Sequence, residues 1–293
     1  LALYLQYNYI PAPYSIYRRV CKLPAGSLLS ISSEDENSSP ETYWDMKEVA
    51  EAGAREPFRG SPDEAADELD ERLRISVGLR MEADVPLGAF LSGGIDSSTV
   101  AAVMQAQSTR PVKTFTIGFD ETAFDEAEDA KRVAEHLGTD HTELYVRPGE
   151  AREVIPRLAD LYDEPFADSS QIPTALVSQL ARQDVTVSLS GDGGDELFGG
   201  YDRYLQGRSL WARLGTIPRP LRPLVAGAFK AIPVSAWNAL FTLLPAAITP
   251  GQKGETMHWL AGNLAGGDFD ALYQRLVSTW NDPEILVPGA AEA

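Results

Sequence analysis

The chain has 293 residues, 44% of them hydrophobic and 23% charged, so it holds enough material for one large domain or two smaller ones. Its formal net charge of -18 argues against a nucleic-acid partner, because such a partner requires a basic face. The single cysteine, Cys21, excludes an internal disulfide and a multi-cysteine metal site. No apolar run approaches the roughly 20 residues of a membrane span and no signal sequence is visible, so we expect a cytoplasmic protein.

The first 57 residues predict an irregular leading segment. Pro11 and Pro13 break any helix, residues 27–32 favour a short strand, and a polar loop follows. Since the chain starts with Leu rather than Met, we expect a fragment of a longer protein.

A helix is predicted from residue 61 to about residue 81. Ser61 is placed to cap it, Pro62 occupies its first turn, and acidic residues follow directly. An apolar face then runs along the segment, so this helix should pack on the structure that follows it.

Residues 85–106 predict a strand, a glycine-containing loop and a helix, in that order. Gly93 and Gly94 remove the Cβ atoms that would keep an anion from the backbone. Ser97 and Ser98 are expected to cap the helix, whose first N–H groups favour negative charge. The loop is therefore predicted to cradle an anion.

Asp96 lies within this anion site, where a carboxylate is repulsive unless a cation lies between it and the anion. The residues point to Mg²⁺ as this cation, because the ligands of Mg²⁺ are carboxylate, water and phosphate oxygens. The alternative is a plain tight turn with Asp96 as a helix cap. The loop is not a Walker loop, because no Gly-Lys-Ser/Thr ends it.

Strands and helices alternate along the next hundred residues, with strands at 112–119, 142–146 and 185–189 and helices at 124–137, 149–162 and 173–183. This alternation predicts an α/β fold with a doubly wound, mainly parallel sheet. Ser92 and Ser190 each follow an apolar strand, so both loops should open on the carboxyl edge of the sheet, where ligands gather. From about residue 206 onward, short apolar segments punctuated by prolines predict an all-α C-terminal region.

The second loop reads Ser190-Gly191-Asp192-Gly193-Gly194-Asp195-Glu196-Leu197-Phe198-Gly199-Gly200-Tyr201. So many acids would be costly to bury without cations. A calcium loop is one alternative, but the regular alternation and the final Glu of such loops are missing. A plain glycine-rich turn is the other.

Together the two loops resemble the synthetase domain of glutamine-hydrolysing asparagine synthetases, which belong to the N-type ATP pyrophosphatases with a Ser-Gly-Gly-x-Asp-Ser pyrophosphate (PP) loop. Further matches lie at residues 114–119, 124–127, 138–141 and 163–168, and the leading segment carries Pro24-Ala25-Gly26 and Tyr43-Trp44. The resemblance implies an adenine nucleotide alpha hydrolase-like fold. It places a linker at 1–57, the ATP pyrophosphatase domain at 58–205 and the helical remainder of that domain at 206–293.

The resemblance also implies roles for individual residues. Pyrophosphate would be bound by Ser92, Gly93, Gly94, Asp96, Ser97 and Ser98, and adenosine would be held by Leu91, Ile117, Ser190 and Gly191. Asp96 and Asp195 would carry Mg²⁺, and Asp192 would lie near the activated acyl group. The implied chemistry uses ATP to adenylylate a carboxylate, usually aspartate, with release of pyrophosphate; ammonia then displaces AMP.

The chain departs from the family in ways that leave alternatives open. The glutaminase domain is missing from it, so we expect that domain on the full-length chain or on a partner, and Cys21 is expected to be a small filler. The family's catalytic lysine in a Lys-Val-Asp-Arg context is also missing, and Lys230 and Lys253 lack that context. The acid could be aspartate, a β-lactam precursor or a sugar acid of a polysaccharide. A non-catalytic nucleotide-binding module is the third alternative, and a homodimer is left open.

Overall fold

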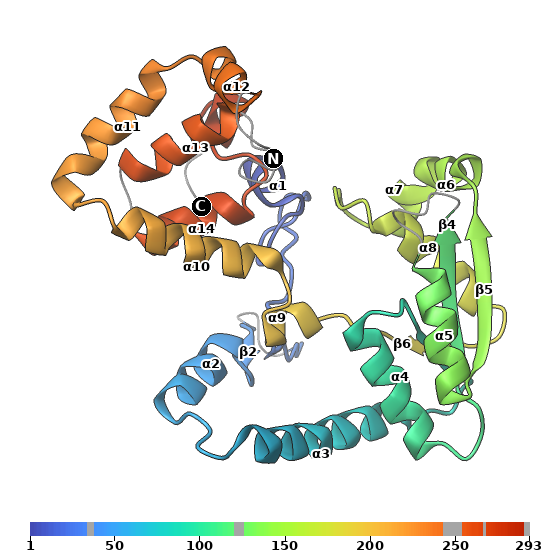
Figure 1. The fold of residues 1–293 in the computed structure, drawn as a ribbon. Coiled ribbons are helices and arrows are strands. Elements are labelled where there is room, and N and C mark those ends of the chain that lie inside the picture. Colours follow the sequence, from blue (N-terminus) through green and yellow to red (C-terminus); the bar gives the residue numbers. More distant parts are fainter. Residues whose placement is uncertain (34–37, 120–125, 243–253, 266–267, 290–293) are drawn as a thin grey trace.

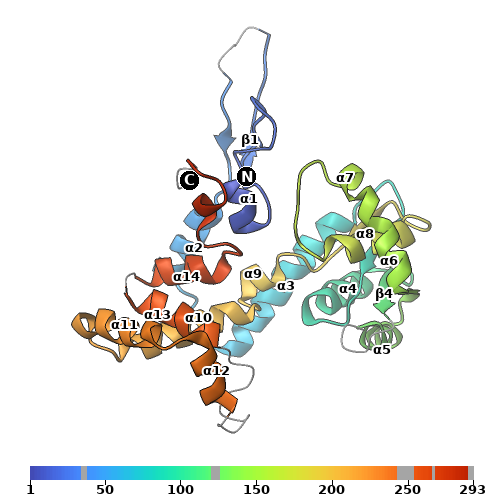
Figure 2. The same cartoon turned by 90° about the horizontal axis from the view of Figure 1, so that it is seen from above.

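The computed structural model describes residues 1–33, 38–119, 126–242, 254–265 and 268–289. Its leading segment contains the helix α1 (Ala2–Tyr7), an antiparallel pair of strands β1 (Ser27–Leu28) and β2 (Glu41–Thr42), and the helix α2 (Met46–Arg55). The strand pair projects away from the rest of the molecule (Figure 2). The expectation of an irregular segment was therefore wrong for α1 and α2. α2 starts at an Asp45 cap whose carboxylate accepts a hydrogen bond from Glu48 N at 2.9 Å.

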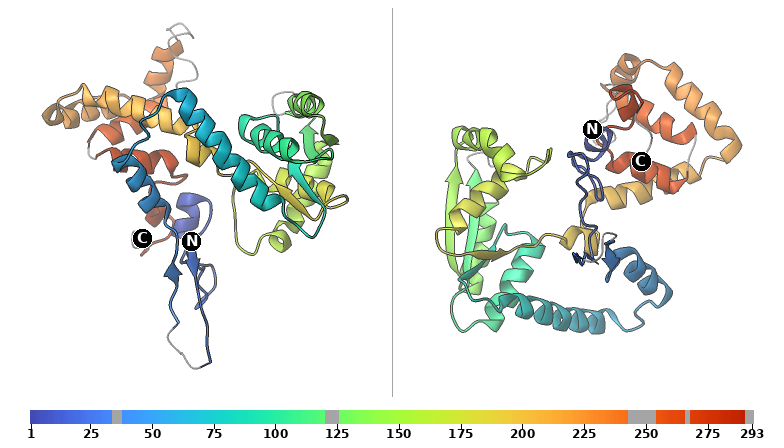
Figure 3. Two further views of the ribbon diagram at one scale, coloured as in Figure 1. Left: turned by 90° about the horizontal axis from the view of Figure 1, so that it is seen from below. Right: turned by 180° about the vertical axis from the view of Figure 1, so that it is seen from behind.

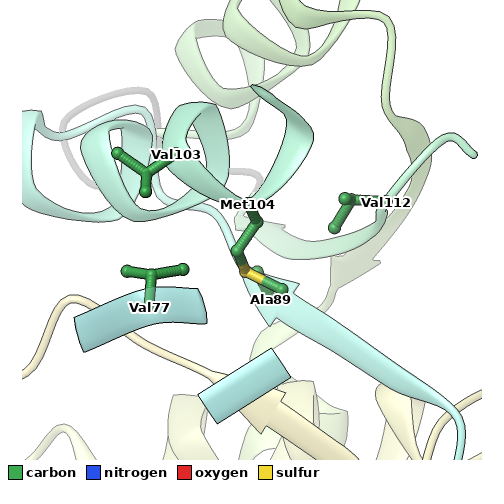
Figure 4. Close-up of a cluster of buried hydrophobic side chains, with 5 residues drawn as sticks. All are labelled: Val77, Ala89, Val103, Met104 and Val112. Atoms are coloured by element: carbon green, nitrogen blue, oxygen red, sulfur yellow. The ribbon is translucent and has the colours of Figure 1, made fainter. Parts of the chain in front are cut away.

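The helix α3 (Pro62–Met81) begins as predicted. Ser61 Oγ accepts a hydrogen bond from Glu64 N at 3.2 Å, and Glu64 Oε2 accepts one from Ser61 N at 2.7 Å, which is a capping box. Val77 is its one buried residue, and it packs against Ala89, Val103 and Met104 (Figure 4). The N-terminal half of α3 thus stands clear of the core.

Four parallel strands form the central sheet in the order β5-β4-β3-β6. They are β3 (Leu87–Phe90), β4 (Lys113–Phe119), β5 (Asp140–Val146) and β6 (Val187–Leu189). β3 lies at the centre between β4 and β6, although about one hundred residues separate it from β6 in the chain. This confirms the predicted α/β class and the parallel sheet.

Helices cover both faces of the sheet (Figure 1). On one face, Leu91 packs with Ala101 of α4 (Ile95–Gln107) and Ala130 of α5 (Ala127–Leu137). On the other face, Phe115 packs with Ala181 of α8 (Gln171–Ala181). The sheet is therefore doubly wound, as predicted. Residues 124 and 125 of the helix predicted at 124–137 lie outside the described residues.

The single helix predicted at 149–162 is instead three short pieces. They are α6 (Pro148–Val154), the 3₁₀ turn η1 (Ile155–Arg157) and α7 (Leu158–Leu161). Pro156 lies inside η1, and a proline removes a helical hydrogen bond and clashes with the preceding turn, so the prediction of a continuous helix was wrong.

The C-terminal part is helical, as predicted, and has a core of its own. After the short helix α9 (Gly194–Phe198) come α10 (Asp202–Gly215), η2 (Arg219–Leu221), α11 (Arg222–Ala231), α12 (Val234–Thr242), α13 (Gly254–Ala265), α14 (Phe269–Val277) and η3 (Pro283–Ile285). Leu214, Ala226, Ala261, Leu264 and Leu272 form its buried cluster. Figure 3 shows this helical body beside the sheet body, with α3 and α9 running between them.

Within the described ranges no single helix has both the length and the apolar composition to cross a bilayer. The pair Arg219–Ala231 and Val234–Thr242 satisfies length and composition only when it is taken together, across a bend of 83°.

Candidate functional site

Both predicted loops open into one cavity of about 810 Å³ at the carboxyl edge of the sheet. The first loop follows β3 and the second follows β6, and these strands are hydrogen-bonded neighbours. Of the residues predicted to form the site, the cavity is lined by Leu91, Ser92, Gly94, Asp96, Ser97, Ile117, Ser190, Gly191, Asp192 and Asp195. Gly93 and Ser98 do not line it.

Hydrogen bonds between two serines hold the first loop. Ser97 Oγ accepts a hydrogen bond from Ser92 N at 3.1 Å and lies 2.9 Å from Ser92 Oγ. The cap of α4 is Gly94, which makes no side-chain cap bond, so the prediction that Ser97 and Ser98 cap this helix was wrong. Ser97 instead closes the loop, because its hydroxyl contacts Ser92 and lies 3.3 Å from Gly94 O, to which it can donate. The Ser98 hydroxyl is buried without a hydrogen-bond partner in the described part of the chain.

Gly93 lies on the side of the first loop that packs against α5. Its φ is +80°, and a Cβ placed on it would lie 2.7 Å from Ala130 N and 2.8 Å from Asp129 Cβ. Only glycine meets both conditions without strain. Gly93 therefore lets the loop lie against the start of α5, rather than opening the backbone directly to the cavity.

The second loop turns sharply into α9. Ser190 Oγ donates a hydrogen bond to Asp192 Oδ2 at 2.9 Å, so the Asp192 carboxylate is held at the cavity edge. Gly193 caps α9 with φ 90°, which is the left-handed region. The sequence predicted a loop here and missed this helix. Asp195 then lies in its first turn and faces the cavity.

The two loops touch through glycines that have no room for a side chain. A Cβ on Gly191 would lie 2.8 Å from Ser97 N, and one on Gly194 would lie 2.6 and 2.8 Å from the two oxygens of Asp96. Within the second loop, a Cβ on Gly200 would lie closer still to Asp195 Oδ1. The carboxylates of Asp96 and Asp195 therefore owe their positions to glycines of the second loop.

The donor set suits a hard cation that also binds phosphate. Within the described ranges no three His, Cys, Asp or Glu side chains are grouped as metal ligands. Mg²⁺ is commonly bound by one or two carboxylates, with substrate phosphates and water as its other ligands. Asp96 and Asp195, which line one cavity, supply such a pair.

Several cavity residues were not predicted, among them Val177 of α8, Glu126 and Phe198. Pro173 and Thr174 of α8 line the cavity beside Val177, and they belong to the segment 163–174, which the sequence allows as the lining of an acid pocket. The spacing of the three α8 residues places them on one helix face, which is a signal available in the sequence. No local pattern shows which face meets the loops, because that depends on strand order.

The segment 138–141, which matched the family, lies away from the cavity. His141 pairs with Thr114 near the amino end of β5, and its Nδ1 lies 2.8 Å from the Thr114 hydroxyl. Burial lowers the pKa of His141, the nearby Glu143 carboxylate raises it by less, and the Lys131 ammonium lowers it further, so the ring is held neutral. Gly138 ends α5 in the left-handed conformation. This motif is structural.

Comparison with known proteins identifies the family. The sequence model described as Asparagine synthase matches residues 68–290. Glutamine-hydrolyzing asparagine synthetase 1 of Bacillus subtilis is 35% identical over 255 residues, which are 87% of this chain and 36% of that protein. Amidase chry2 of Gibberella zeae is 32% identical over 208 residues, which are 65% of this chain and 30% of that protein.

Among solved structures, an NH3-dependent NAD synthetase from Campylobacter jejuni is 15% identical in sequence, and the match covers 69% of this chain and 97% of the synthetase chain. The TM-score of this match is 0.33, which is too low to support a conclusion. The chain spans about a third of the length of the curated relatives it matches. The family match covers most of the chain and includes both loops. The chain belongs to the asparagine synthase family.

Proposed function

We propose that this chain is the synthetase part of an ATP-dependent amide-forming enzyme. An oxygen of a carboxylic acid attacks the α-phosphorus of ATP, the bond to pyrophosphate breaks, and an acyl-adenylate forms. Ammonia then attacks the acyl carbon, AMP leaves, and the nitrogen loses a proton. Aspartate is the first acid to test, and the ammonia would come from glutamine hydrolysed elsewhere on the full-length protein or on a partner.

One observation carries the proposal: a single cavity joins the loops that follow two neighbouring parallel strands. Such an edge is where α/β sheets bind nucleotides. The cavity also combines a glycine-containing loop with two carboxylates, which is the combination that a polyphosphate with a divalent cation requires.

Each loop would take a separate part of ATP. Ser92, Gly94 and Ser97 would hold pyrophosphate, and Leu91, Ile117, Ser190 and Gly191 would hold adenosine. Gly93 would support this arrangement by letting the loop lie close to α5, and Ser98 would offer its free hydroxyl within the loop. Asp192, fixed by Ser190, would lie beside the acyl group.

Asp96 and Asp195 would carry Mg²⁺, which when bound neutralises the charge that grows on the leaving pyrophosphate. The chain's own part is to fix both carboxylates in advance. Gly194 and Gly200 support this role, because each leaves space for one of them. A preorganised pair costs no reorganisation during the reaction.

A second acid is a candidate because a relative in sequence carries another name. Amidase chry2 matches 65% of this chain, so aspartate is tested within a panel that includes β-amino acids and sugar acids. Pro173 and Thr174 line the cavity from α8 and support placing the acid between α8 and Asp192.

The test is to incubate the protein with Mg-ATP, ammonium and each acid, and to identify the nucleotide product. AMP and pyrophosphate whose formation depends on one acid support the proposal and name the substrate. Tight binding of ATP without dependence on Mg²⁺, and without AMP from any acid, would favour a non-catalytic nucleotide-binding module instead.

A further inference from the structure

The short helix α9, which carries Asp195, is not held in place by packing. It has only five residues, and a helix of that length is not stable by itself. None of the five is buried, and its two large apolar side chains, Leu197 and Phe198, are 67% and 59% exposed. The position of Asp195 at the cavity therefore depends on the hydrogen bonds that α9 makes.

One side-chain hydrogen bond closes the end of this helix. Within the described ranges it is the one such bond of an α9 side chain: the Tyr201 hydroxyl donates to Glu196 Oε1 at 2.8 Å. The bond spans the turn at Gly199 and Gly200, and Gly199 is in the left-handed conformation with φ 70°. It raises the pKa of Tyr201 to about 12, with smaller contributions from burial and from the charges of Glu196 and Asp195. The hydroxyl therefore keeps its proton and remains a donor at neutral pH.

The turn that this bond closes also contacts Asp195. Gly200 N donates a hydrogen bond to Asp195 O at 3.0 Å. A Cβ on Gly200 would overlap Asp195 Oδ1, so the backbone of Gly200 lies directly against the carboxylate. Tyr201 follows Gly200 in the chain, and its bond to Glu196 fixes where the turn lies. A shift of the turn would therefore shift the surface against which the Asp195 carboxylate rests.

Tyr201 is itself anchored to the helical C-terminal part. The Arg203 guanidinium lies 4.8 Å from the centre of its ring. The Tyr204 ring meets it edge-on, with the ring centres 5.7 Å apart, and stacks in turn on Tyr273 of α14 at 6.2 Å. The hydrogen bond from Tyr201 to Glu196 thus ties α9 to a set of rings that belongs to the helical body.

We propose that Tyr201 and Glu196 are positioning residues that hold the Asp195 carboxylate where it can bind Mg²⁺. The inference rests on the proposed function, in which Asp195 carries that ion. Neither Tyr201 nor Glu196 lines the cavity, so their effect on the ion passes through Asp195. Their bond joins the helical body to the metal carboxylate across α9, which runs between the two bodies (Figure 3). Partners behind a metal ligand commonly change metal affinity by about 10- to 100-fold.

The experiment measures binding of α,β-methylene-ATP by calorimetry, once with Mg²⁺ and once with EDTA. This analogue cannot release pyrophosphate, so the measurement needs no acid and no reaction. The ratio of the two affinities is the gain that the metal provides. Tyr201→Phe removes only the hydroxyl, so the gain should fall by about 10-fold while the affinity in EDTA and the melting temperature stay nearly unchanged.

Tyr204→Phe is the matched control. It also removes one tyrosine hydroxyl from the same set of rings, but that hydroxyl bonds with Tyr273 rather than with Glu196. The gain from the metal should therefore be the same in Tyr204→Phe as in the unsubstituted protein.

Two variants of Glu196 separate its hydrogen bond from its charge. Glu196→Gln keeps an acceptor oxygen for Tyr201 and loses the charge, so it should retain most of the gain, whereas Glu196→Ala should lose as much as Tyr201→Phe. The double variant Tyr201→Phe/Glu196→Ala should be no weaker than either single variant, because both remove the same bond. A direct effect of the Glu196 charge on the ion would instead make Glu196→Gln fall with Glu196→Ala.

The inference is overturned if Tyr201→Phe keeps the gain, if Tyr204→Phe loses as much, or if the two Glu196 variants behave alike. An unsubstituted protein with no gain from Mg²⁺ would overturn it together with the assignment of Asp195 as a metal ligand. Absence of AMP with every acid, measured on the same preparation, would count against the proposed reaction alone. The binding measurements therefore distinguish a failure of the positioning role from a failure of the proposed function.

Discussion

Gly194→Ala gives a direct test of whether the position of the Asp96 carboxylate matters. Gly194 is the first residue of α9, and its φ lies outside the left-handed region, so alanine suits its backbone. An added Cβ would lie 2.6 and 2.8 Å from the two Asp96 oxygens, whereas ordinary contact begins at 3.4 Å. Asp96 Cγ lies closer still to the added Cβ, so the carboxylate group must move by about 1 Å, which it can do because it is the mobile end of a side chain.

The shift of the Asp96 carboxylate should have little effect on the stability of the fold and a large effect on the rate of the reaction. In a helix, alanine is favoured over glycine by roughly 0.5–1 kcal/mol, so Gly194→Ala should unfold at the same temperature as the unsubstituted protein or slightly higher. A misplacement of about 1 Å in a catalytic group can cost about 10²-fold in rate. We expect AMP formation to fall by that order and the Mg²⁺ concentration for half-maximal rate to rise.

The assay is pyrophosphate release against Mg²⁺ concentration, with the melting temperature measured in parallel. Gly227→Ala is the matched control, because it is also a glycine-to-alanine change in a helix and its added Cβ would meet nothing within 4 Å. A Gly194→Ala variant that matched Gly227→Ala in rate and in Mg²⁺ dependence would refute the idea that Gly194 holds Asp96 in place.

Four further substitutions test other parts of the structure. Asp96→Asn and Asp195→Asn should each lower AMP formation by about 10²-fold or more, and near-normal AMP formation in either variant would reject its assignment as a metal ligand. Ser61→Ala removes a cap normally worth about 1 kcal/mol, but it does so far from the buried end of α3, so hydrogen exchange should rise in the first turn with little change in melting temperature. His141 has a lowered pKa and is neutral when folded, so the unfolded chain binds more protons; the stability from this residue is present above about pH 6.5 and is lost as the pH falls below it. Denaturant midpoints at pH 5.5 and 7.5 should therefore differ less in His141→Gln than in the unsubstituted protein.

Local signals were sufficient to predict the first loop and most elements of the sheet. The helix that begins after Ser61 has a capping serine, a proline and two acidic residues in its first turn. These few neighbouring residues are enough to predict where the helix starts. The apolar run before Ser92 and the alanine-rich run after it likewise each fix one element. Predictions failed where a local signal was weak or was outweighed, as at Pro156 and in α9, whose Gly-Asp-Glu start has low helix propensity.

The side-chain roles within the loops depend on strand order, which no local signal contains. Ser97 is a residue type that favours helix caps, yet it lies inside α4 and its hydroxyl bonds to Ser92 across the turn of the first loop. Val177, which lines the cavity from α8, was missed for a related reason. Its position over the cavity follows from packing against Phe115 on β4, which is a contact between segments about sixty residues apart.

The glycines of the second loop illustrate how far a sequence pattern alone can be interpreted. Gly193 and Gly199 have positive φ and are explained by their own backbone. The other three glycines of the loop, Gly191, Gly194 and Gly200, do not have a positive φ, so any residue could adopt their backbone conformation. A side chain is excluded there only by neighbouring atoms, which belong to Ser97, Asp96 and Asp195. Two of these three glycines thus make room for the protein's own carboxylates rather than for a phosphate. For Gly191 and Gly194 that requirement arises only because β6 lies beside β3, which brings the second loop onto the first, whereas Gly200 meets Asp195 within the second loop itself.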